Sequence, residues 1–242
     1  MNNLYKIVIN ILKLFDDIKS KKIFILLSKY LQTDSIVFDV GSHKGETVFL
    51  INKYLKVQKV YSFEISEKNF NIMKKKILNK KFNFLFYFYN FGFSDKAQKK
   101  IFFQAKESSS TTLSQININS EYFKKKLRIL GIKKKENFFQ KENCYLDTLD
   151  NFLINNNIKK IDLLKIDTEG HEYQILKGGN KNLKNIRFIY FEHHYDNMIL
   201  KGYTFSEIHN FLAQNNFKRI YKSKMFFRKT FEYVYKNYNF NS

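Results

Sequence analysis

Short apolar runs alternate along the chain with segments in which apolar residues recur every three or four positions. The run Ser35–Val40 is apolar, β-branched and followed by a glycine, which predicts a buried strand. Helical spacing follows over about Gly45–Leu55, and a second apolar run predicts a strand at Lys59–Glu64. Ser66 then precedes a helical pattern that extends to about Leu78, and we expect it to cap that helix.

The rest of the chain continues this alternation of strands and helices. Parallel neighbours need a helical crossover, whereas the last two strands are expected to pair antiparallel at the sheet edge. The pattern predicts an α/β, Rossmann-like fold: a doubly wound, mostly parallel seven-stranded sheet with helices on both faces. The further strands are expected at Phe82–Phe91, Lys99–Gln104, Asn143–Leu149, Ile161–Asp167, Ile186–Glu192, Phe217–Tyr221 and Thr230–Tyr235, and the further helices at Ser120–Leu130, Leu149–Asn155, Tyr173–Gly178 and Thr204–Gln214.

No segment of biased composition divides the chain, so we expect a single domain over residues 1–242. Residues 1–34 are expected to form a helical extension, with helices at about Leu4–Lys19 and Lys21–Leu31. Residues 35–242 form the expected core, which carries an insertion at about 98–148. The first helical pattern is amphipathic, and packing on the domain is favoured over binding at a membrane surface.

The formal net charge of +21 is unusually positive for 242 residues. Such a charge is typical of proteins that bind nucleic acid or an anionic membrane surface. Here the lysines are spread in short runs such as Lys74–Lys76, Lys124–Lys126 and Lys133–Lys135, which favours solvated helix faces. Lys, Asn, Ile, Phe and Tyr also share A/T-rich codons, so a biased genome is an alternative source of the composition. A peripheral contact with an anionic membrane therefore stays open.

Cys144 is the single cysteine, so no intrachain disulfide can form, which fits a reducing cytoplasm. It lies in a stretch of alternating apolar residues, which predicts a buried thiol. The longest apolar runs, Ile23–Leu27 and Phe82–Phe93, are well short of the ~20 residues that span a bilayer. We therefore expect a cytoplasmic protein without a transmembrane segment.

Acidic and glycine residues follow the expected strands where the ligands of doubly wound sheets bind, outside the carboxyl ends of the strands. Gly41 permits a tight turn after the first strand, and Gly45 lets the next helix approach closely. The spacing lacks the middle glycine of dinucleotide-binding loops. Asp39, at the end of the strand, would repel phosphates but attract an amino or sulfonium group.

The second and third strands also end in polar residues. Glu64 is positioned to accept hydrogen bonds from both hydroxyls of a ribose. Asn90 and Gly92, after the third strand, suit the edge of an adenine.

A charged block follows the fourth strand. Lys165 alternates with apolar residues, so its charge needs a partner inside the sheet, for which Asp39 and Asp167 are candidates. Asp167, Glu169 and His171 are expected beside the point where the strand order reverses. A role with substrate or cofactor is favoured there over simple compensation of a helix dipole.

These residues resemble those of the FkbM-type methyltransferases over about Ser35–His194. The family's loop usually reads Gly-Ala-Asn, whereas this chain has Gly41-Ser42-His43. The resemblance implies a class I methyltransferase fold, S-adenosylmethionine as methyl donor, and O-methylation, often of sugars or related natural products. It rests on Val37–Gly41 with Gly45, Phe63–Glu64, Ser108–Leu113, Leu146–Asp150, Leu176–Gly178 and, above all, Ile161–Glu172.

The resemblance and the strand-end pattern together give a set of site residues. Methyl transfer needs an aligned acceptor oxygen and a base for its proton, and it needs no nucleophilic side chain. No metal is expected, because Asp167, Glu169 and His194 match no recognised metal motif. We assign Asp39, Gly41, His43, Gly45, Glu46, Glu64, Asn90 and Gly92 to donor binding, and His171, His193, His194 and Asp167 are the candidate bases.

The sequence thus predicts an S-adenosylmethionine-dependent O-methyltransferase that acts on a hydroxyl of a sugar, glycan or related natural product. An RNA methyltransferase is the alternative that the positive charge favours. A non-catalytic S-adenosylmethionine-binding module also stays open, because the fold alone does not prove activity. A nicotinamide-dependent oxidoreductase would need the missing glycine. The acceptor and the oligomeric state are not readable from the sequence.

Overall fold

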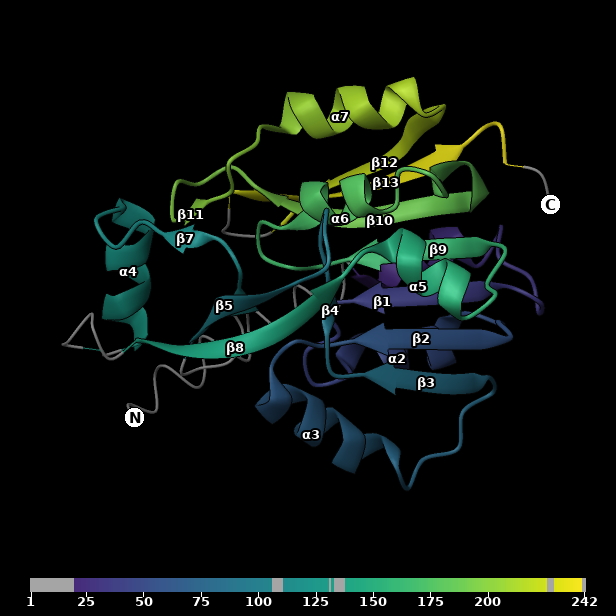
Figure 1. Cartoon of the computed structure of the whole chain (residues 1–242), viewed down its shortest axis with the longest axis horizontal. Coiled ribbons are helices and arrows are strands. Elements are labelled where there is room, and N and C mark those ends of the chain that lie inside the picture. The colour runs from purple at the N-terminus through teal and green to yellow at the C-terminus, as the bar shows by residue number, and fades with distance from the viewer. Residues whose placement is uncertain (1–19, 106–110, 131, 133–137, 226–228, 241–242) are drawn as a thin grey trace.

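A computed structural model describes residues 20–105, 111–130, 132, 138–225 and 229–240 of the chain. Its centre is a seven-stranded sheet with the strand order β12-β13-β10-β9-β1-β2-β3 (Figure 1). The order reverses beside β1, which has β2 on one side and β9 on the other. The strands are β1 (Ile36–Val40), β2 (Lys59–Phe63), β3 (Leu85–Tyr89), β9 (Ile161–Ile166), β10 (Ile186–His194), β12 (Phe217–Lys224) and β13 (Thr230–Asn237).

The strands from β3 to β10 are parallel, and β13 runs antiparallel to both β10 and β12. The predicted mostly parallel α/β sheet, with an antiparallel pair at its edge, is therefore confirmed. Strand β3 is shorter than the expected Phe82–Phe91, because its partner β2 offers hydrogen bonds over Lys59–Phe63 only.

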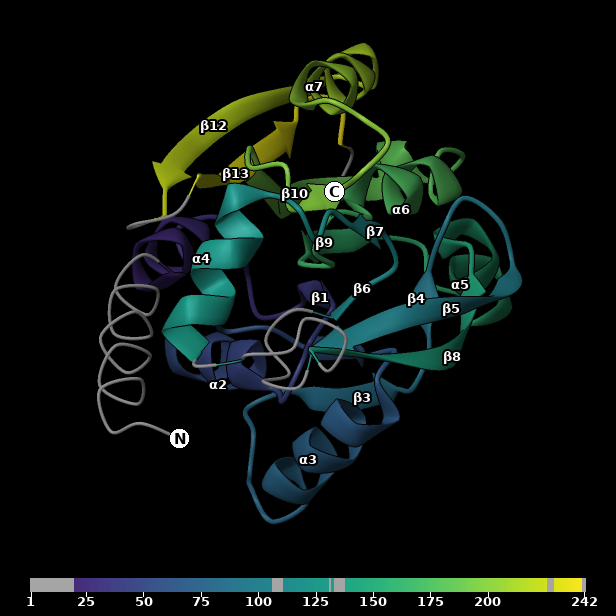
Figure 2. The same cartoon turned by 90° about the vertical axis from the view of Figure 1, so that its left-hand side faces the viewer.

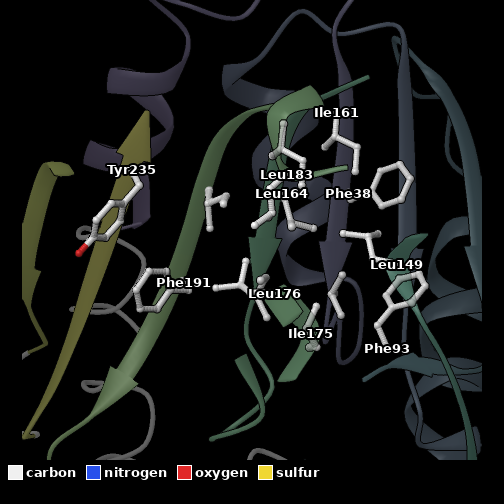
Figure 3. Close-up of a cluster of buried hydrophobic side chains, with 14 of the residues drawn as sticks. Phe38, Phe93, Leu149, Ile161, Leu164, Ile175, Leu176, Leu183, Phe191 and Tyr235 are labelled. Carbon is white, nitrogen blue, oxygen red and sulfur yellow. The ribbon is translucent and has the colours of Figure 1, made fainter. Parts of the chain in front are cut away.

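Helices cover both faces of the sheet, as predicted. One face packs on helical residues 20–27, α2 (Glu46–Tyr54) and α3 (Glu67–Ile77). The other face packs on α5 (Leu149–Asn155), α6 (Glu172–Gly178) and α7 (Phe205–Gln214). Alternation along β1 supplies both cores, because Val37 points to the first face and Phe38 to the second. Figure 3 shows part of the second core, where Phe38 lies near the helix residue Leu149.

Side-chain caps fix where several helices begin. The Ser66 hydroxyl accepts a hydrogen bond from the Asn69 N–H, as the sequence predicts. Thr204 and Glu207 form a reciprocal capping box at the start of α7. Helix α2 begins differently: its cap residue is Gly45 in a left-handed conformation.

The insertion builds a second, smaller structure on the carboxyl ends of the parallel strands (Figures 1 and 2). Its sheet has the strand order β4-β8-β5-β6, and β7 pairs separately with β11. The sequence predicted β5 and β8 as strands but not their sheet, because Gln98–Ala105 pairs with a segment far along the chain. These elements are β4 (Gly92–Phe93), β5 (Gln98–Ala105), β6 (Thr111–Thr112), β7 (Gln115–Ile116), α4 (Glu121–Leu130), β8 (Phe139–Asp147) and β11 (Ile199–Leu200).

Several expectations fall wholly or partly outside the described residues. These are the helix at Leu4–Lys19, the serines at 108–110 and the lysine run at 133–135. The expected helix Lys21–Leu31 is helical to Leu27 and continues as a turn. No helix in the described part of the chain has both the length and the apolar character to cross a bilayer. Cys144 is buried, as expected, and burial raises its pKa to about 11.

Candidate active site

A cavity of about 270 Å³ opens at the carboxyl ends of β1, β2, β9 and β10. This is the edge where the sequence places its acids and glycines. Insertion residues Thr111 and Leu113 form part of the wall, as do Ser20 and Phe24 of the first helix. Of the sequence-predicted residues, the wall contains Gly41, His43, Glu46, Glu64, Gly92, Asp167 and His171.

The turn after β1 is pressed against the loop that follows β9. Gly41 has a φ of +82°, and a Cβ at this position would lie 1.9 Å from the carbonyl oxygen of Asp167. The Gly41 N–H donates to the Phe63 carbonyl over 2.9 Å, which ties the same turn to β2. Glycine is therefore required here by its backbone angle and by the lack of space.

His43 has a φ of +50°, in the left-handed region that asparagine and glycine adopt most readily. Its backbone N–H donates to the Glu64 carboxylate over 2.8 Å, and its Nδ1 lies 3.2 Å from Glu46 Oε2. This backbone angle gives a physical reason why the family's usual asparagine suits the position.

A pair of substitutions tests this reading of His43. His43→Asn is expected to change the free energy of unfolding by no more than about 0.5 kcal/mol, because asparagine tolerates the backbone angle. His43→Val is expected to cost about 1–3 kcal/mol, because a β-branched side chain is strained there. Urea unfolding of both variants checks this. Equal stabilities would contradict the assigned conformation.

Glu64 lies at the end of β2 with 4% of its surface exposed, on the wall of the cavity. One carboxylate oxygen accepts the His43 N–H and the other the Ser66 N–H, both over 2.8 Å. Burial raises its pKa to about 7 in spite of these donors. Each oxygen has a further lone pair that can accept a hydroxyl of a ligand.

Asn90 and Gly92 take different positions. The Asn90 side chain donates to the backbone carbonyls of Glu64 and Ile65, over 2.8 and 3.3 Å, and is not among the described wall residues. These hydrogen bonds hold the backbone at the end of β2. Gly92 lines the cavity, where a Cβ would meet Ile65 Cγ2 at 2.5 Å.

Lys165 joins two carboxylates at the cavity wall. Its ammonium lies 3.1 Å from Asp39 and 3.3 Å from Asp167, so both partners foreseen from the sequence are present. Asp39 is fully buried and lies behind the wall, whereas Lys165 and Asp167 line it. Burial raises the pKa of Asp39, and the nearby Lys165 opposes that rise.

The predicted histidines lie in three different surroundings. His171 lines the cavity, hydrogen-bonds Ser94 over 3.0 Å, and has its pKa lowered by burial to about 4. His193 points to the opposite face of β10 from Glu192, because side chains alternate along a strand, and it packs against Tyr195 and Tyr203. The structure thus places His193 away from the described cavity wall.

His194 is held by acids. Its Nε2 lies 3.0 Å from Glu169 and 3.4 Å from Glu192, and its Nδ1 lies 3.1 Å from the Thr230 hydroxyl. Although burial opposes it, the carboxylates around His194 raise its pKa to about 10. The ring is therefore a cation at neutral pH and cannot accept a proton. Among the described residues, no group of three His, Cys, Asp or Glu side chains has the arrangement of a metal site.

Three hydrogen-bonding side chains on the wall were not identified as site residues from the sequence, namely Tyr190, Glu192 and Glu232. Tyr190 and Glu192 share one face of β10, and Glu232 is the cross-strand partner of Glu192 on β13. The Tyr190 hydroxyl donates to Glu232 over 2.5 Å. Alternation along β10 was the available signal for the first two, whereas nothing local marks Glu232.

The family model for the methyltransferase FkbM domain matches residues 39–219 of this chain. The match covers the turn at Gly41, the end of β2 and the block around Lys165. The chain therefore belongs to the FkbM methyltransferase family.

Two solved methyltransferase structures are similar in fold. An FkbM methyltransferase from Methylobacillus flagellatus KT matches with a TM-score of 0.55 and 11% identity, over 86% of this chain and 45% of that chain. The magnesium protoporphyrin IX methyltransferase from Synechocystis PCC 6803, solved with bound S-adenosylmethionine, matches with a TM-score of 0.52 and 11% identity, over 98% of this chain and 85% of that chain. This chain thus spans less than half of the Methylobacillus protein. A search of curated proteins by sequence finds no match.

Proposed function

We propose that this protein is an S-adenosylmethionine-dependent O-methyltransferase whose acceptor is a hydroxyl of a sugar, glycan or related natural product. The observation that carries the proposal is the Glu64 carboxylate on the wall of a cavity that begins at the Gly41 turn. Family membership supports methyl transfer as the chemistry. The hydroxyl acceptor rests on the family resemblance and on the chemistry of the cavity wall.

The wall near β1 and β2 fits the methyl donor. Glu64 offers carboxylate oxygens to the two ribose hydroxyls, and the apolar side chains of Ile65 and Phe93 offer a surface for a purine. Gly41 and Gly92 allow the loops of this wall to approach one another more closely than any Cβ would permit. The carboxylate of Asp167 suits the positive charge of a sulfonium or amino group.

S-adenosylmethionine, when bound, supplies a methyl group attached to a positively charged sulfur. The chain's own residues hold the acceptor in line with that group, exclude water and take up the hydroxyl proton. Lys165 keeps Asp167 in place, over 3.3 Å. The insertion restrains the neighbouring loop, since Thr112 donates to the Glu169 carbonyl over 2.7 Å and Ser114 to the Gly170 carbonyl over 2.9 Å.

The end of the cavity near β10 and β13 favours a neutral, hydroxyl-rich acceptor over an anionic one. Asp167, Glu169, Glu192 and Glu232 all line this end. Carboxylates accept hydrogen bonds from hydroxyls, whereas they repel a phosphate. The positive charge of the whole chain still favours nucleic acid as the second candidate acceptor, so RNA belongs in the acceptor test.

Donor binding is expected to strengthen as the pH rises through about 7, the pKa of Glu64. The raised pKa means that the folded protein prefers the protonated Glu64 carboxyl. The contribution of this group to folding stability is therefore fully present at a pH below the ordinary pKa of a glutamate, and it is lost as the pH rises through 7. Ribose hydroxyls prefer the ionised form. The dissociation constant of S-adenosylhomocysteine should therefore fall by roughly tenfold between pH 6 and pH 8. Calorimetric titration checks this, and a flat profile would contradict the role of Glu64.

The acceptor is tested by transfer of a labelled methyl group. The purified protein is incubated with methyl-labelled S-adenosylmethionine and separate panels of free sugars, glycolipids, polyhydroxylated natural products and RNA. Label on a sugar or natural-product hydroxyl is the expected result. Label on RNA alone would replace the proposed acceptor, and donor binding without transfer to any panel would favour a non-catalytic module.

We place this activity in the cytoplasm, with a small-molecule or glycan acceptor as the partner. Cys144 is the single cysteine of the chain, so no intrachain disulfide forms, which supports a reducing compartment. A contact with an anionic membrane surface would bring the enzyme close to glycolipid acceptors, and the basic composition supports it.

A further inference from the structure

The proposed reaction needs a base near the acceptor, and the residues at the β10 end of the cavity differ in their fitness for that role. Tyr190 lies beside Lys165 in the register of β10 and β9. Glu192 and Asp167 follow on the same face of their strands, so the four side chains form one row along the cavity wall.

Glu192 stands directly opposite Glu232 in the antiparallel pair of β10 and β13. Like charges at such a position destabilise a sheet, and here both side chains line the cavity, with Glu232 buried and Glu192 partly exposed. The Tyr190 hydroxyl already donates to Glu232. An arrangement that costs stability indicates a functional role for one of its members. Because Tyr190 already engages Glu232, we assign that role to Glu192, which lines the cavity.

The other candidate bases are less suitable. One carboxylate oxygen of Asp167 is already engaged by the Lys165 ammonium, 3.3 Å away. His194 is a cation, and His193 faces away from the cavity. His171 stays neutral but is a weak proton acceptor, because burial lowers its pKa to about 4.

We infer that Glu192 is the catalytic base, accepting the proton of the acceptor hydroxyl, and that His194, 3.4 Å away, is the residue that positions it. This inference rests on the proposed function. As the acceptor oxygen bonds to the methyl carbon, the bond from that carbon to sulfur breaks with its electron pair kept by sulfur. The O–H proton moves to a Glu192 oxygen, so charge and atoms balance.

The charges around Glu192 set its strength. Burial and the nearby Asp167 raise the pKa of Glu192 well above its ordinary range, whereas the cationic His194 opposes the rise. A carboxylate with a raised pKa is a stronger base, which suits work near neutral pH. The titratable groups that face it are Lys165 from β9, Asp167 and Glu169 from the following loop, Tyr190 and His194 from β10, and Glu232 from β13.

Glu192→Gln is the decisive variant, with Glu67→Gln on the exposed start of α3 as the matched control. We expect kcat of Glu192→Gln to fall by about 10²–10⁴-fold, with the dissociation constant of S-adenosylhomocysteine unchanged within threefold. The rise of kcat with pH on the acidic side should disappear, and Glu192→Asp should restore part of the rate. A melting temperature close to that of the wild-type protein will show that the variant folds, because glutamine keeps the shape of the side chain.

The inference would be overturned if Glu192→Gln kept the wild-type kcat and its rise with pH on the acidic side. It would also be overturned if that rise were lost in His171→Gln and not in Glu192→Gln. Failure of the proposed function looks different: the wild-type protein would then bind no donor. Carbon-detected titration of the Glu192 carboxyl by NMR needs no acceptor. An ordinary carboxyl pKa for Glu192 would overturn the assignment, and a pKa well above that range would support it.

Discussion

Lys165→Met is expected to destabilise the folded protein by about 3–5 kcal/mol, because it leaves a buried charge without its counterion. Asp39 is fully buried, and its side chain has the Lys165 ammonium at 3.1 Å. Methionine fills a similar volume but supplies no charge. Urea unfolding followed by circular dichroism measures the change in the free energy of unfolding. The loss should shrink as the pH falls, because a protonated Asp39 no longer needs a cation.

Lys124→Met is the matched control for this prediction. Lys124 lies 2.7 Å from Glu121 on α4, where Glu121 is exposed and Lys124 is partly exposed. An exposed pair contributes about 0–1 kcal/mol, so this variant should unfold almost as the wild-type protein does. Equal and small effects in the two variants would show that Lys165 does not compensate a buried charge.

Gly41→Ala is expected to cost roughly 3 kcal/mol or more and to abolish donor binding. Two penalties add at this position. The left-handed φ of +82° costs an alanine about 1–2 kcal/mol, and its Cβ would lie 1.9 Å from the Asp167 carbonyl oxygen. Relief of this collision has to separate the turn after β1 from the loop after β9, and both line the cavity.

Gly202→Ala separates the two penalties experimentally. Gly202 has a φ of +72°, but a Cβ there would meet no atom within 4 Å. Only the cost of the backbone angle should appear, about 1–2 kcal/mol, with donor binding intact. If Gly41→Ala were no more destabilising than Gly202→Ala, the close approach of the two loops would be wrong.

Much of the proposed donor side of the cavity could be predicted from local sequence. Short apolar runs predict buried strands, and the residues that follow parallel strands lie together at one edge of the sheet. Gly41, Glu64 and Gly92 therefore reached the same cavity wall from three separate strand ends. Lys165 needed a partner because it interrupts an apolar strand, and both candidates lie within 3.3 Å of it.

The arrangement at the β10 end of the cavity, the proposed acceptor side, depends on long-range pairing that no local sequence pattern contains. The sequence places His193 and His194 together, but only the register of β10 decides which one approaches Glu169. Glu169 reaches His194 from a backbone with a φ of +53°. Glu232 lies on a strand far along the chain and meets Glu192 through cross-strand pairing. The pairing of β5 with β8 could likewise not be predicted from the sequence, because the two strands lie far apart along the chain.

The charge of the protein and the charge of its cavity have opposite signs. The chain carries a net charge of +21, whereas Glu64, Asp167, Glu169 and Glu192 line the cavity. A positively charged methyl donor is drawn to such a wall, while the outer surface supports contact with anionic assemblies. Net charge alone thus favours nucleic acid, whereas the carboxylates of the cavity support the proposed hydroxyl acceptor.

Calorimetric titration with S-adenosylhomocysteine at pH 8 tests the central claim most directly, namely that the cavity at Glu64 binds the methyl donor. We expect saturable binding to the wild-type protein, at least tenfold weaker binding to Glu64→Gln, and unchanged binding to the exposed control Glu67→Gln. Equal affinity for S-adenosylhomocysteine in all three proteins, or a preference of the wild-type protein for NAD, would contradict the account.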